Sequence, residues 1–473
     1  MHPLDDDIAA IATAPGAAGL AVVRVSGRGA IALADAVFRG RRPLGAAGSH
    51  TLHHGRAVWP ETPGAAAPMP RPAPGTPLDE VVAAVFRAPR SYTRQDVVEF
   101  SCHGGRLPAD RVLSALLAAG ARLAAPGEFT LRAFLGGRLD LAQAEAVADL
   151  IHAETDAARS LALAQLGGAL SSRIEALAER IADAAAEVEA RVDFAEDVGG
   201  IEVPVSVTAA IAGADADLAA LLEGAAYARA VREGVRVPLI GRPNVGKSSL
   251  FNALVGEERA IVTPEPGTTR DRVSEAVEIA GVRVTLSDTA GLREASGPIE
   301  AIGIARAREA LDHGVAVLWV VDRSEPLAVE DRAIAARLAG KPAIVALNKS
   351  DLGAAIAAGE IDALFDGAPH RVVAVSATGG AGLPALRAAL AELVGADGAP
   401  GLAGAVGNPR HADALGRART ALARALAAAR VSAPGEIVAL ELREALGAVG
   451  EVTGRAVGED LLERIFSRFC VGK

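Results

Sequence analysis

GRPNVGKS, residues 241–248, follows the apolar run VRVPLI and opens a segment with helical spacing. A G-x-x-x-x-G-K-[ST] pattern between a strand and a helix is typical of a loop that binds phosphate. Gly241 and Gly246 let this loop curl so that its backbone amides face the phosphate oxygens. Lys247 is expected to reach the β- and γ-phosphates, and the hydroxyl of Ser248 is expected to bind Mg²⁺.

Around this loop, apolar strand candidates alternate with turns and helical segments. Five of them are VRVPLIG, RVTLSDTAG, AVLWVVD, PAIVALNKSD and RVVAVSA, all between residues 235 and 377. This alternation predicts a doubly wound, mainly parallel sheet. The sequence therefore favours an α/β domain of the P-loop class.

The flanking segments differ from this pattern. Residues 139–193 carry apolar side chains at helical spacing, broken at Gly167-Gly168, and residues 409–473 return to that spacing. Residues 1–125 contain short β-like runs at 20–25, 81–86 and 97–100. We predict four parts: an α+β N-terminal domain at 1–127, the first half of an all-α helical domain at 128–233, an inserted P-loop domain at 234–396, and the second helical half at 397–473.

Two motifs after the phosphate loop predict that the bound nucleotide carries guanine. In NKSD, residues 348–351, the Asp351 carboxylate can accept two N–H bonds from a guanine edge. Adenine offers no matching pair of donors and would leave the carboxylate unpaired, which is costly. Asn348 can bond the ring and Lys349 can pack on its face. The amide of Ala377, in the SAT motif, is expected to meet the guanine carbonyl.

The phosphate end of the site is completed by DTAG, residues 288–291. Asp288 is expected to hold the metal through water, and the Gly291 amide is expected to touch the γ-phosphate. Thr269 is the candidate switch hydroxyl that joins Mg²⁺ only when the γ-phosphate is present, so Ser248 and Thr269 are the predicted magnesium ligands. The residues predicted to contact GTP are Asn244, Val245, Gly246, Lys247, Ser248, Ser249, Thr263, Pro264, Glu265, Pro266, Gly267, Thr268, Thr269, Asp288, Thr289, Ala290, Gly291, Asn348, Lys349, Asp351, Ser376, Ala377 and Thr378.

The residue after DTAG is Leu292, where small signalling GTPases place a glutamine that orients the attacking water. A leucine cannot orient water, so another group has to do so. Glu294 could act as a base through a second water. The residues alone leave equally open that Arg293 and Glu294 are solvated switch residues.

The composition of the chain limits its function. About half of the 473 residues are apolar, as in a globular protein, and the formal net charge of −10 gives no bulk basic field for nucleic acid. Two cysteines, Cys102 and Cys470, are too few for a disulfide framework and suit a reducing compartment. The N-terminus lacks the core of a signal peptide, and the apolar run at 315–321 is too short for a membrane span. We expect a soluble, cytoplasmic protein with no membrane partner.

Several longer stretches carry a family resemblance. They are IATAPGAAGLAVVRVSG near the N-terminus, SYTRQDVVEFSCHGG at 91–105, APGEFTLRAFLGGRLDLAQAEAVADLI at 125–151, GLREASGPIEAIGIARA after DTA, and the terminal LLERIFSRFCVGK. Together with the nucleotide motifs, they make the chain resemble the MnmE (TrmE) family of tRNA-modification GTPases. The resemblance covers nearly the whole chain, and the C-x-G-K ending is its most specific part.

The resemblance implies a homodimer formed through the N-terminal domain. That domain is expected to bind a tetrahydrofolate derivative, in its 5-formyl or methylene form, as a one-carbon donor. A hetero-oligomer with the flavoprotein MnmG, also called GidA, is expected to act on tRNA and to install (carboxymethyl)aminomethyl-type groups at carbon 5 of the wobble uridine, position 34. GTP hydrolysis stimulated by K⁺ is expected to accompany pairing of the GTPase domains.

Residue roles follow from the same resemblance. Glu294 matches the catalytic glutamate of the family. The matching folate positions are Arg24, Glu99, Arg138 and Lys473, with Arg138 standing where some members have lysine. Cations suit the glutamate tail of folate, and a carboxylate suits the donors of its pterin edge. The matching potassium ligands are the side chain of Asn244 and the backbone carbonyls of Thr263, Glu265 and Thr268.

Other functions stay open from the residues. One alternative is a GTP-switched ribosome-assembly factor, which would need a KH-type or second GTPase domain, and the sequence shows no sign of either. Another is a folate-dependent methyltransferase with a regulatory GTPase. Cys470 is a nucleophile, a group near the folate or tRNA site, or a small buried residue. FRGRRP at 38–43 and the arginines of 410–430 either touch tRNA phosphate or lie on solvated surfaces.

Overall fold

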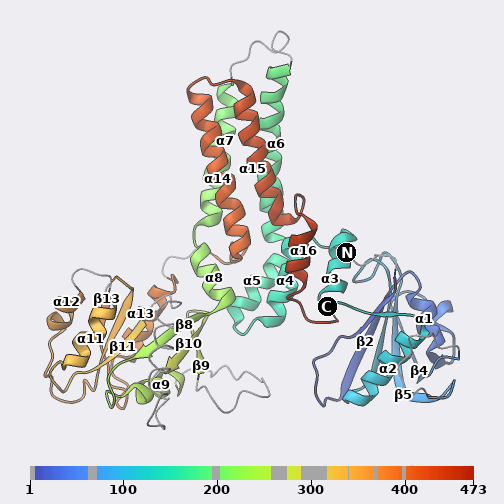
Figure 1. The fold of residues 1–473 in the computed structure, drawn as a ribbon, viewed down its shortest axis with the longest axis horizontal. Helices are drawn as coiled ribbons and strands as arrows, with labels where there is room; N and C mark the ends of the chain where they lie inside the picture. Colours follow the sequence, from blue (N-terminus) through green and yellow to red (C-terminus); the bar gives the residue numbers. More distant parts are fainter. Residues whose placement is uncertain are drawn as a thin grey trace. The chain divides into compact units, whose positions relative to one another are not determined.

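The computed structural model describes residues 6–61, 72–193, 203–256, 274–288, 317–338, 340–365, 370–396 and 401–472 (Figure 1). The chain divides into two compact units. The N-terminal unit contains residues 1–148 and 450–473, and the central unit contains residues 149–449. An α+β part, a mainly parallel α/β part and an all-α part that flanks the latter in sequence are all present, which confirms the predicted fold class.

The N-terminal unit is built on a seven-stranded sheet with the order β3-β4-β5-β6-β2-β1-β7. Neighbouring strands are antiparallel, except that β7 pairs with β1 in parallel. The strands are β1 (Ile8–Ile11), β2 (Leu20–Gly27), β3 (Phe38–Gly40), β4 (Thr51–Val58), β5 (Pro77–Phe86), β6 (Asp96–His103) and β7 (Arg122–Leu123). The three predicted β-like runs are confirmed as parts of β2, β5 and β6.

One face of this sheet is buried. Side chains alternate along a strand, so Val23 and Val25 of β2 point to the same side as Val98 and Phe100 of β6. They pack with helices α1 (Ala30–Ala36) and α2 (Arg106–Ala119) in one apolar core. Arg24 and Glu99 lie on the opposite face, where their side chains are 13% and 26% exposed.

The C-terminal segment belongs to this unit. Helix α16 (Glu459–Phe466) packs against α3 (Glu128–Leu135), and the rings of Phe466 and Phe134 lie 6.3 Å apart between centroids. The start of α4 (Leu141–His152) closes the same small apolar cluster. A short 3₁₀ turn, Leu44–Ala46, completes the elements of the unit. This cluster holds the last residues of the chain beside the N-terminal sheet.

The central unit contains a six-stranded sheet with the order β13-β12-β11-β8-β10-β9. All neighbours are parallel except β9 and β10. The strands are β8 (Val235–Ile240), β9 (Ser274–Ile279), β10 (Val282–Asp288), β11 (Val317–Asp322), β12 (Ala343–Asn348) and β13 (His370–Ala374). All five predicted strands are confirmed, whereas the antiparallel edge strand β9 was not predicted.

Helices cover both faces of this sheet. In β11, Leu318 and Val320 join the core that contains helices α9 (Lys247–Gly256) and α13 (Leu383–Leu393). The alternate residues Val317, Trp319 and Val321 join a second core. That core contains helices α11 (Val329–Leu338) and α12 (Ala358–Phe365). Burial on both faces explains why β11 is an unbroken apolar run.

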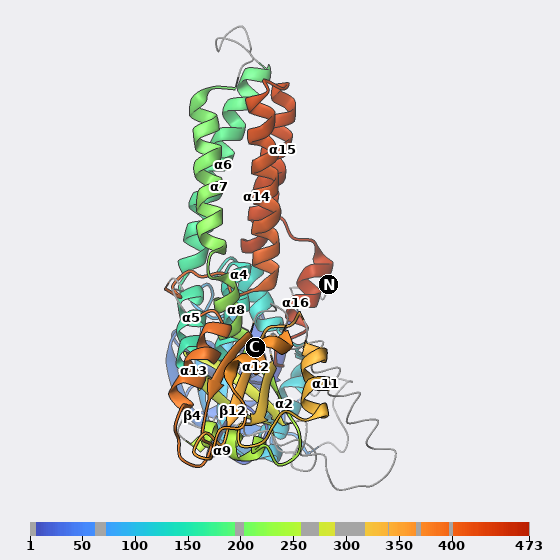
Figure 2. The ribbon, with the colours of Figure 1, turned by 90° about the vertical axis from the view of Figure 1, so that its left-hand side faces the viewer.

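Four long helices form a bundle, namely α6 (Ala169–Asp193), α7 (Val205–Leu222), α14 (Pro409–Arg430) and α15 (Gly435–Thr453) (Figures 1 and 2). In α6 the buried residues Leu170, Ile174, Leu177 and Ile181 recur at helical spacing. The predicted break at Gly167-Gly168 is confirmed. A further break at 153–155 was not predicted, and there the Thr155 side chain caps α5 (Asp156–Leu166) by accepting from the amide of Ala158.

The segment Val205–Glu233 is long and apolar enough to cross a membrane by length and composition alone. In the structure it is two helices, α7 and α8 (Ala225–Glu233), and α7 packs against α6 and α14. A core helix of a bundle meets the same criterion, so the segment gives no argument for a membrane span.

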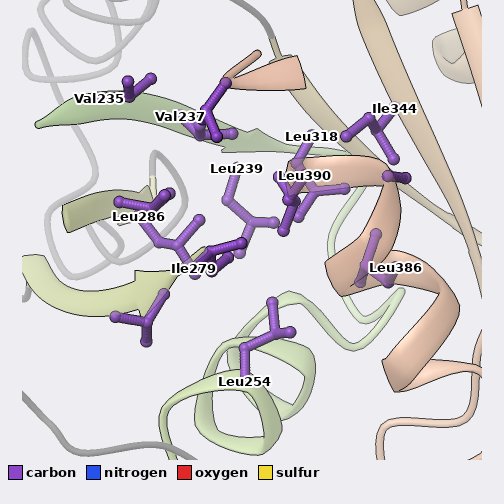
Figure 3. Close-up of a cluster of buried hydrophobic side chains, with 14 of the residues drawn as sticks. Val235, Val237, Leu239, Leu254, Ile279, Leu286, Leu318, Ile344, Leu386 and Leu390 are labelled. Carbon is purple, nitrogen blue, oxygen red and sulfur yellow. The ribbon is translucent and has the colours of Figure 1, made fainter. Parts of the chain in front are cut away.

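The base of the bundle and the sheet share one apolar core. Leu161 of α5 and Val231 of α8 belong to the same cluster as Val237 and Leu239 of β8. Figure 3 shows how Val237, Leu239, Leu318, Leu386 and Leu390 converge in this cluster. The turn between β9 and β10 is tied to the same helices, because Thr155 Oγ1 donates to the Gly281 carbonyl and Tyr227 Oη donates to that of Ala280, both at 2.9 Å.

Candidate functional site

The loop between β8 and α9 has the conformation that the phosphate-loop pattern requires. Gly241 has a φ of 150°, and a Cβ there would lie 2.3 Å from the Val320 carbonyl oxygen. Gly246 has a φ of 92°, and a Cβ there would lie 2.2 Å from the amide nitrogen of Asn348. Any side chain at either position would force the loop open.

Lys247 begins α9 and its side chain turns back over the loop. Its Nζ donates to the carbonyls of Gly241 at 3.0 Å and Arg242 at 2.6 Å. The residue is 6% exposed, so its positive charge is held within the loop. Together with the N-terminus of α9, this charge favours an anion at the mouth of the loop.

Asn348, the first residue of NKSD, joins three loops. Its side-chain amide donates to the Val245 carbonyl at 2.8 Å, and its side-chain oxygen accepts from the amide of Ala377 at 3.1 Å. The side chain is 1% exposed, so these bonds are well shielded from water. The phosphate loop, the NKSD loop and the SAT loop are therefore assembled into one site, as the sequence predicted.

The next residue, Lys349, has a φ of 61°, in the left-handed region that lysine rarely adopts. Its Nζ lies 2.5 Å from Oδ2 of Asp322, the last residue of β11. Burial tends to raise the pKa of Asp322, but Lys349 and Ser324 outweigh it and lower the pKa. The Asp351 carboxylate is exposed at the mouth of this loop, as a group that awaits a ligand must be.

The SAT loop is stiffened by its own hydrogen bonds. Ser376 is fully buried, and its hydroxyl accepts from the amide of Gly379 at 2.9 Å. The same hydroxyl lies 3.3 Å from that of Thr378. The amide of Ser350 donates to the carbonyl of Val375, the residue after β13, which links the NKSD loop to the end of that strand.

An ion pair links the phosphate loop to the start of α11. Nε of Arg242 lies 2.7 Å from Oδ2 of Asp331, which is completely buried at the start of α11. The contact is an ion pair without the angle of a good hydrogen bond. Arg242, Asp322 and Asp331 were not predicted from the sequence. Asp322 could have been found from the sequence, because it is an acid that directly follows the apolar run of β11.

Several predicted GTP residues lie outside the described residues. They are Thr263, Pro264, Glu265, Pro266, Gly267, Thr268, Thr269, Thr289, Ala290 and Gly291, and the predicted catalytic residue Glu294 also lies outside the described residues. The backbone of Asp288 ends β10, and its Cα pairs with that of Leu239, two residues before the phosphate loop. The first residue of DTAG is thus at the correct edge of the sheet.

The N-terminal unit brings together three of the four predicted folate residues. Arg24 and Glu99 are paired across β2 and β6, and Arg24 Nε donates to Glu99 Oε1 at 2.7 Å. The Arg24 guanidinium also lies 5.5 Å from the ring centres of Tyr92 and Phe129. Arg138 lies 4.9 Å from the Tyr92 ring, so Tyr92 contacts both cations.

The C-terminal tail reaches this group. Arg24 Nη1 donates to the Gly472 carbonyl at 3.3 Å, and the Gly127 amide donates to the Cys470 carbonyl at 3.3 Å. Gly472 has a φ of 93°, and a Cβ there would lie 2.4 Å from the Ile11 carbonyl oxygen. Lys473 itself lies outside the described residues.

The structure bears on two questions that the sequence left open, namely the role of Cys470 and that of the arginines of 410–430. Cys470 is exposed, so it is not a small buried residue. The arginines of α14 are largely matched by acids: Arg419 pairs with Asp215 of α7, and Arg424 pairs with Glu441 and Glu444 of α15. A solvated, ion-paired helix face therefore accounts for these arginines.

Comparisons with known proteins agree with this architecture. Residues 7–138 match the model of the GTP-binding protein TrmE N-terminus, and residues 141–470 match the model of the MnmE helical domain. A protein of Symbiobacterium thermophilum named tRNA modification GTPase MnmE is 48% identical over 99% of this chain and 100% of its own length. Proteins with the same name from Chloroflexus aurantiacus and Geobacillus kaustophilus are 45% and 42% identical, with coverage of at least 99% in both directions.

These relatives span nearly the whole chain, and the two family models together cover residues 7–138 and 141–470. The nucleotide loops assembled by Asn348 are those of a GTP hydrolase. The chain belongs to the MnmE (TrmE) family of tRNA-modification GTPases.

Proposed function

We propose that this protein hydrolyses GTP, with stimulation by K⁺, to drive modification of carbon 5 of the wobble uridine in certain tRNAs. It would act with a flavoprotein of the MnmG (GidA) type and with a folate one-carbon donor. We place it in the cytoplasm, as a homodimer, in line with the tRNA substrate that its relatives' names give. The observation that carries the proposal is the joining of three nucleotide loops by Asn348.

The nucleotide loops fit GTP and Mg²⁺. The curled loop at Gly241 and Gly246 leaves its amides without side-chain obstruction, and Lys247 supplies a charge for the phosphates. Ser248, in the first turn of α9, would bind the metal together with Thr269, and Asp288 would hold it through water. When bound, Mg²⁺ offsets the charge that develops on the phosphate oxygens.

Asn244 fits a monovalent cation. Its φ of 65° places it at the bend of the phosphate loop, where a neutral amide oxygen can reach toward the β–γ bridge. Carbonyls of Thr263, Glu265 and Thr268 would complete the shell. Oxygen ligands without a protein charge suit a weakly hydrated ion such as K⁺, which would supply positive charge there. Glu294 would orient or activate water in place of the glutamine that Leu292 replaces.

The group around Arg24 fits a folate. Tyr92 and Phe129 offer flat apolar surface, while Arg24 and Arg138 offer cations for carboxylates. The Gly472 carbonyl on Arg24 would place the charge of Lys473 at the same site. Glu99 would accept from the pterin edge while it keeps Arg24 in place.

The experiment is mass spectrometry of tRNA nucleosides from a deletion strain of the native host. Loss of the modified uridine at position 34, restored by the wild-type chain but not by a variant that cannot bind GTP, is the expected result. An intact wobble uridine together with accumulated ribosomal-subunit precursors would instead support the ribosome-assembly factor.

A further inference from the structure

Asp322 is a buried acid beside the guanine-recognition loop. It is 3% exposed, and both of its oxygens are engaged. Oδ1 accepts from the amide of Ser324 at 2.9 Å and from its hydroxyl at 2.6 Å. Oδ2 accepts from Nζ of Lys349 at 2.5 Å. Ser324 thus fixes the rotation of the carboxylate, and the carboxylate fixes the end of the lysine.

The strand register creates this contact. Asp322 and Asn348 are Cα partners at the parallel ends of β11 and β12. The amide of Arg323 donates to the Asn348 carbonyl at 2.9 Å, which holds the two strand ends together. Lys349 follows with its left-handed backbone, and its side chain returns to the end of β11.

To contact the guanine, the Lys349 side chain must be held in one conformation, and its flexibility opposes this. Its apolar stem is expected to cover one face of the guanine. A lysine side chain loses much of its rotamer freedom when it is fixed. If Asp322 holds the ammonium group before the nucleotide arrives, much of this cost is met during folding and not during binding.

We propose that Asp322 is a positioning residue for guanine nucleotides, which holds the Lys349 stem in place to receive the purine ring. It acts through Lys349 and touches no reacting atom. The role concerns the GTP site described above and is independent of the folate, K⁺ and tRNA parts of the proposed function.

The segment that begins with Asp322 also stabilises the phosphate loop, at the other end of the GTP site. The segment from Asp322 to Asp331 links β11 to α11, and Asp331 carries the ion pair with Arg242 of the phosphate loop. Asp331 Oδ2 also accepts from the Ala328 amide at 3.1 Å, which caps α11. The two acids therefore serve different ends of the nucleotide, which allows their effects to be told apart.

The test is a double-mutant cycle on the full-length chain. Asp322→Asn keeps the shape but removes the charge, and it presents an amide donor to the lysine. We expect the dissociation rate of fluorescently labelled GDP, and the dissociation constants of GDP and GTP, to rise about tenfold. The rate of single-turnover hydrolysis from the bound state should not change, because the lysine contacts the base and not the phosphates.

The decisive comparison uses Lys349→Ala. If Asp322 acts through Lys349, adding Asp322→Asn to Lys349→Ala causes little further loss of GDP affinity. A full additional tenfold loss in that background, or an unchanged dissociation rate in the single variant, would overturn the proposal. Asp362→Asn is the matched control, since Asp362 is an exposed acid of α12 that pairs with His370. It should leave nucleotide binding unchanged.

A second variant covers the case in which Asp322→Asn does not fold. Ser324→Ala removes the hydroxyl that orients the carboxylate and leaves the ion pair in place. We expect GDP to dissociate a few times faster, and this effect should also vanish beside Lys349→Ala. An effect of equal size in both backgrounds would show that Ser324 and Asp322 only stabilise the strand end.

Discussion

The GTP site and the candidate folate site are built in opposite ways. The GTP site consists of backbone loops at the carboxyl ends of parallel strands, and Asn348 joins them. The candidate folate site consists of side chains on antiparallel neighbours, β2 and β6, together with a tail 448 residues further along the chain. The chemistry of a loop site can be read from contiguous motifs, whereas the contacts of a side-chain site become visible only after folding.

The largest expected effect separates catalysis from binding at the GTP site. Glu294→Ala should slow hydrolysis by about a hundredfold or more while nucleotide affinity stays near normal, since a general base matters in the transition state. Single-turnover phosphate release measures this effect. Glu330→Ala, at an exposed acid of α11, is the control. Near-normal turnover in Glu294→Ala would remove this residue from the mechanism.

The next prediction tests whether the NKSD loop alone sets base specificity. Asp351→Asn should lower GTP affinity by about a hundredfold, because two hydrogen bonds to a charged acceptor are lost. Xanthosine triphosphate should bind the variant better than it binds the wild type. Calorimetry with a reduced folate provides the internal control, since the other site should not respond. Unchanged GTP affinity would contradict the assignment of this loop.

The third prediction concerns the K⁺ site, whose predicted ligands come from two separate loops and not from one contiguous motif. Turnover in KCl should exceed turnover in NaCl at equal ionic strength by at least about thirtyfold, because a cation beside the β–γ phosphates is strongly stabilising in other GTPases. Asn244→Ala should abolish the difference and leave GTP binding nearly intact. K⁺ should also promote pairing of the GTPase domains, which light scattering can follow. Equal wild-type rates in the two salts would make Asn244 an ordinary loop residue.

The smallest expected effect addresses the folate site. A chain that ends at Phe469 loses the Gly472 carbonyl on Arg24 and the Cys470 carbonyl on Gly127. We expect about tenfold weaker folate binding in calorimetry, with GTP binding unchanged. Lys473→Ala separates the lost charge from the lost backbone contacts. Equal affinity of the full and shortened chains would remove the tail from the site and weaken the contrast between the two sites.

The sequence predicted the parallel sheet because its central strands are fully buried. β11 and β12 are apolar up to their last residues, Asp322 and Asn348, so neither can be mistaken for a surface segment. Strand β9, SEAVEI, escaped prediction because it is an edge strand that carries two glutamates and gains its conformation from β10. The break before α5 escaped because Thr155 acts both as a cap and as a donor to the distant Gly281.

The same reasoning applies to the sites. Gly241, Gly246 and Asn348 were predictable because a local pattern dictates their chemistry. The contact between Asp322 and Lys349 depends on the register of β11 and β12, which no local pattern contains. Tyr92 was missed because an aromatic residue in a loop gains its meaning from Arg24 and Arg138, which come from other elements.

The core shared by the bundle base and the sheet limits how this protein can be divided. A fragment cut at residues 234 and 396, where the sequence texture changes, would leave Leu161 and Val231 behind and expose the side chains that they cover. The exchange of nucleotide-binding cassettes between relatives should therefore carry α5 and α8 with the sheet. Two parts that are separate along the chain thus depend on one shared apolar core.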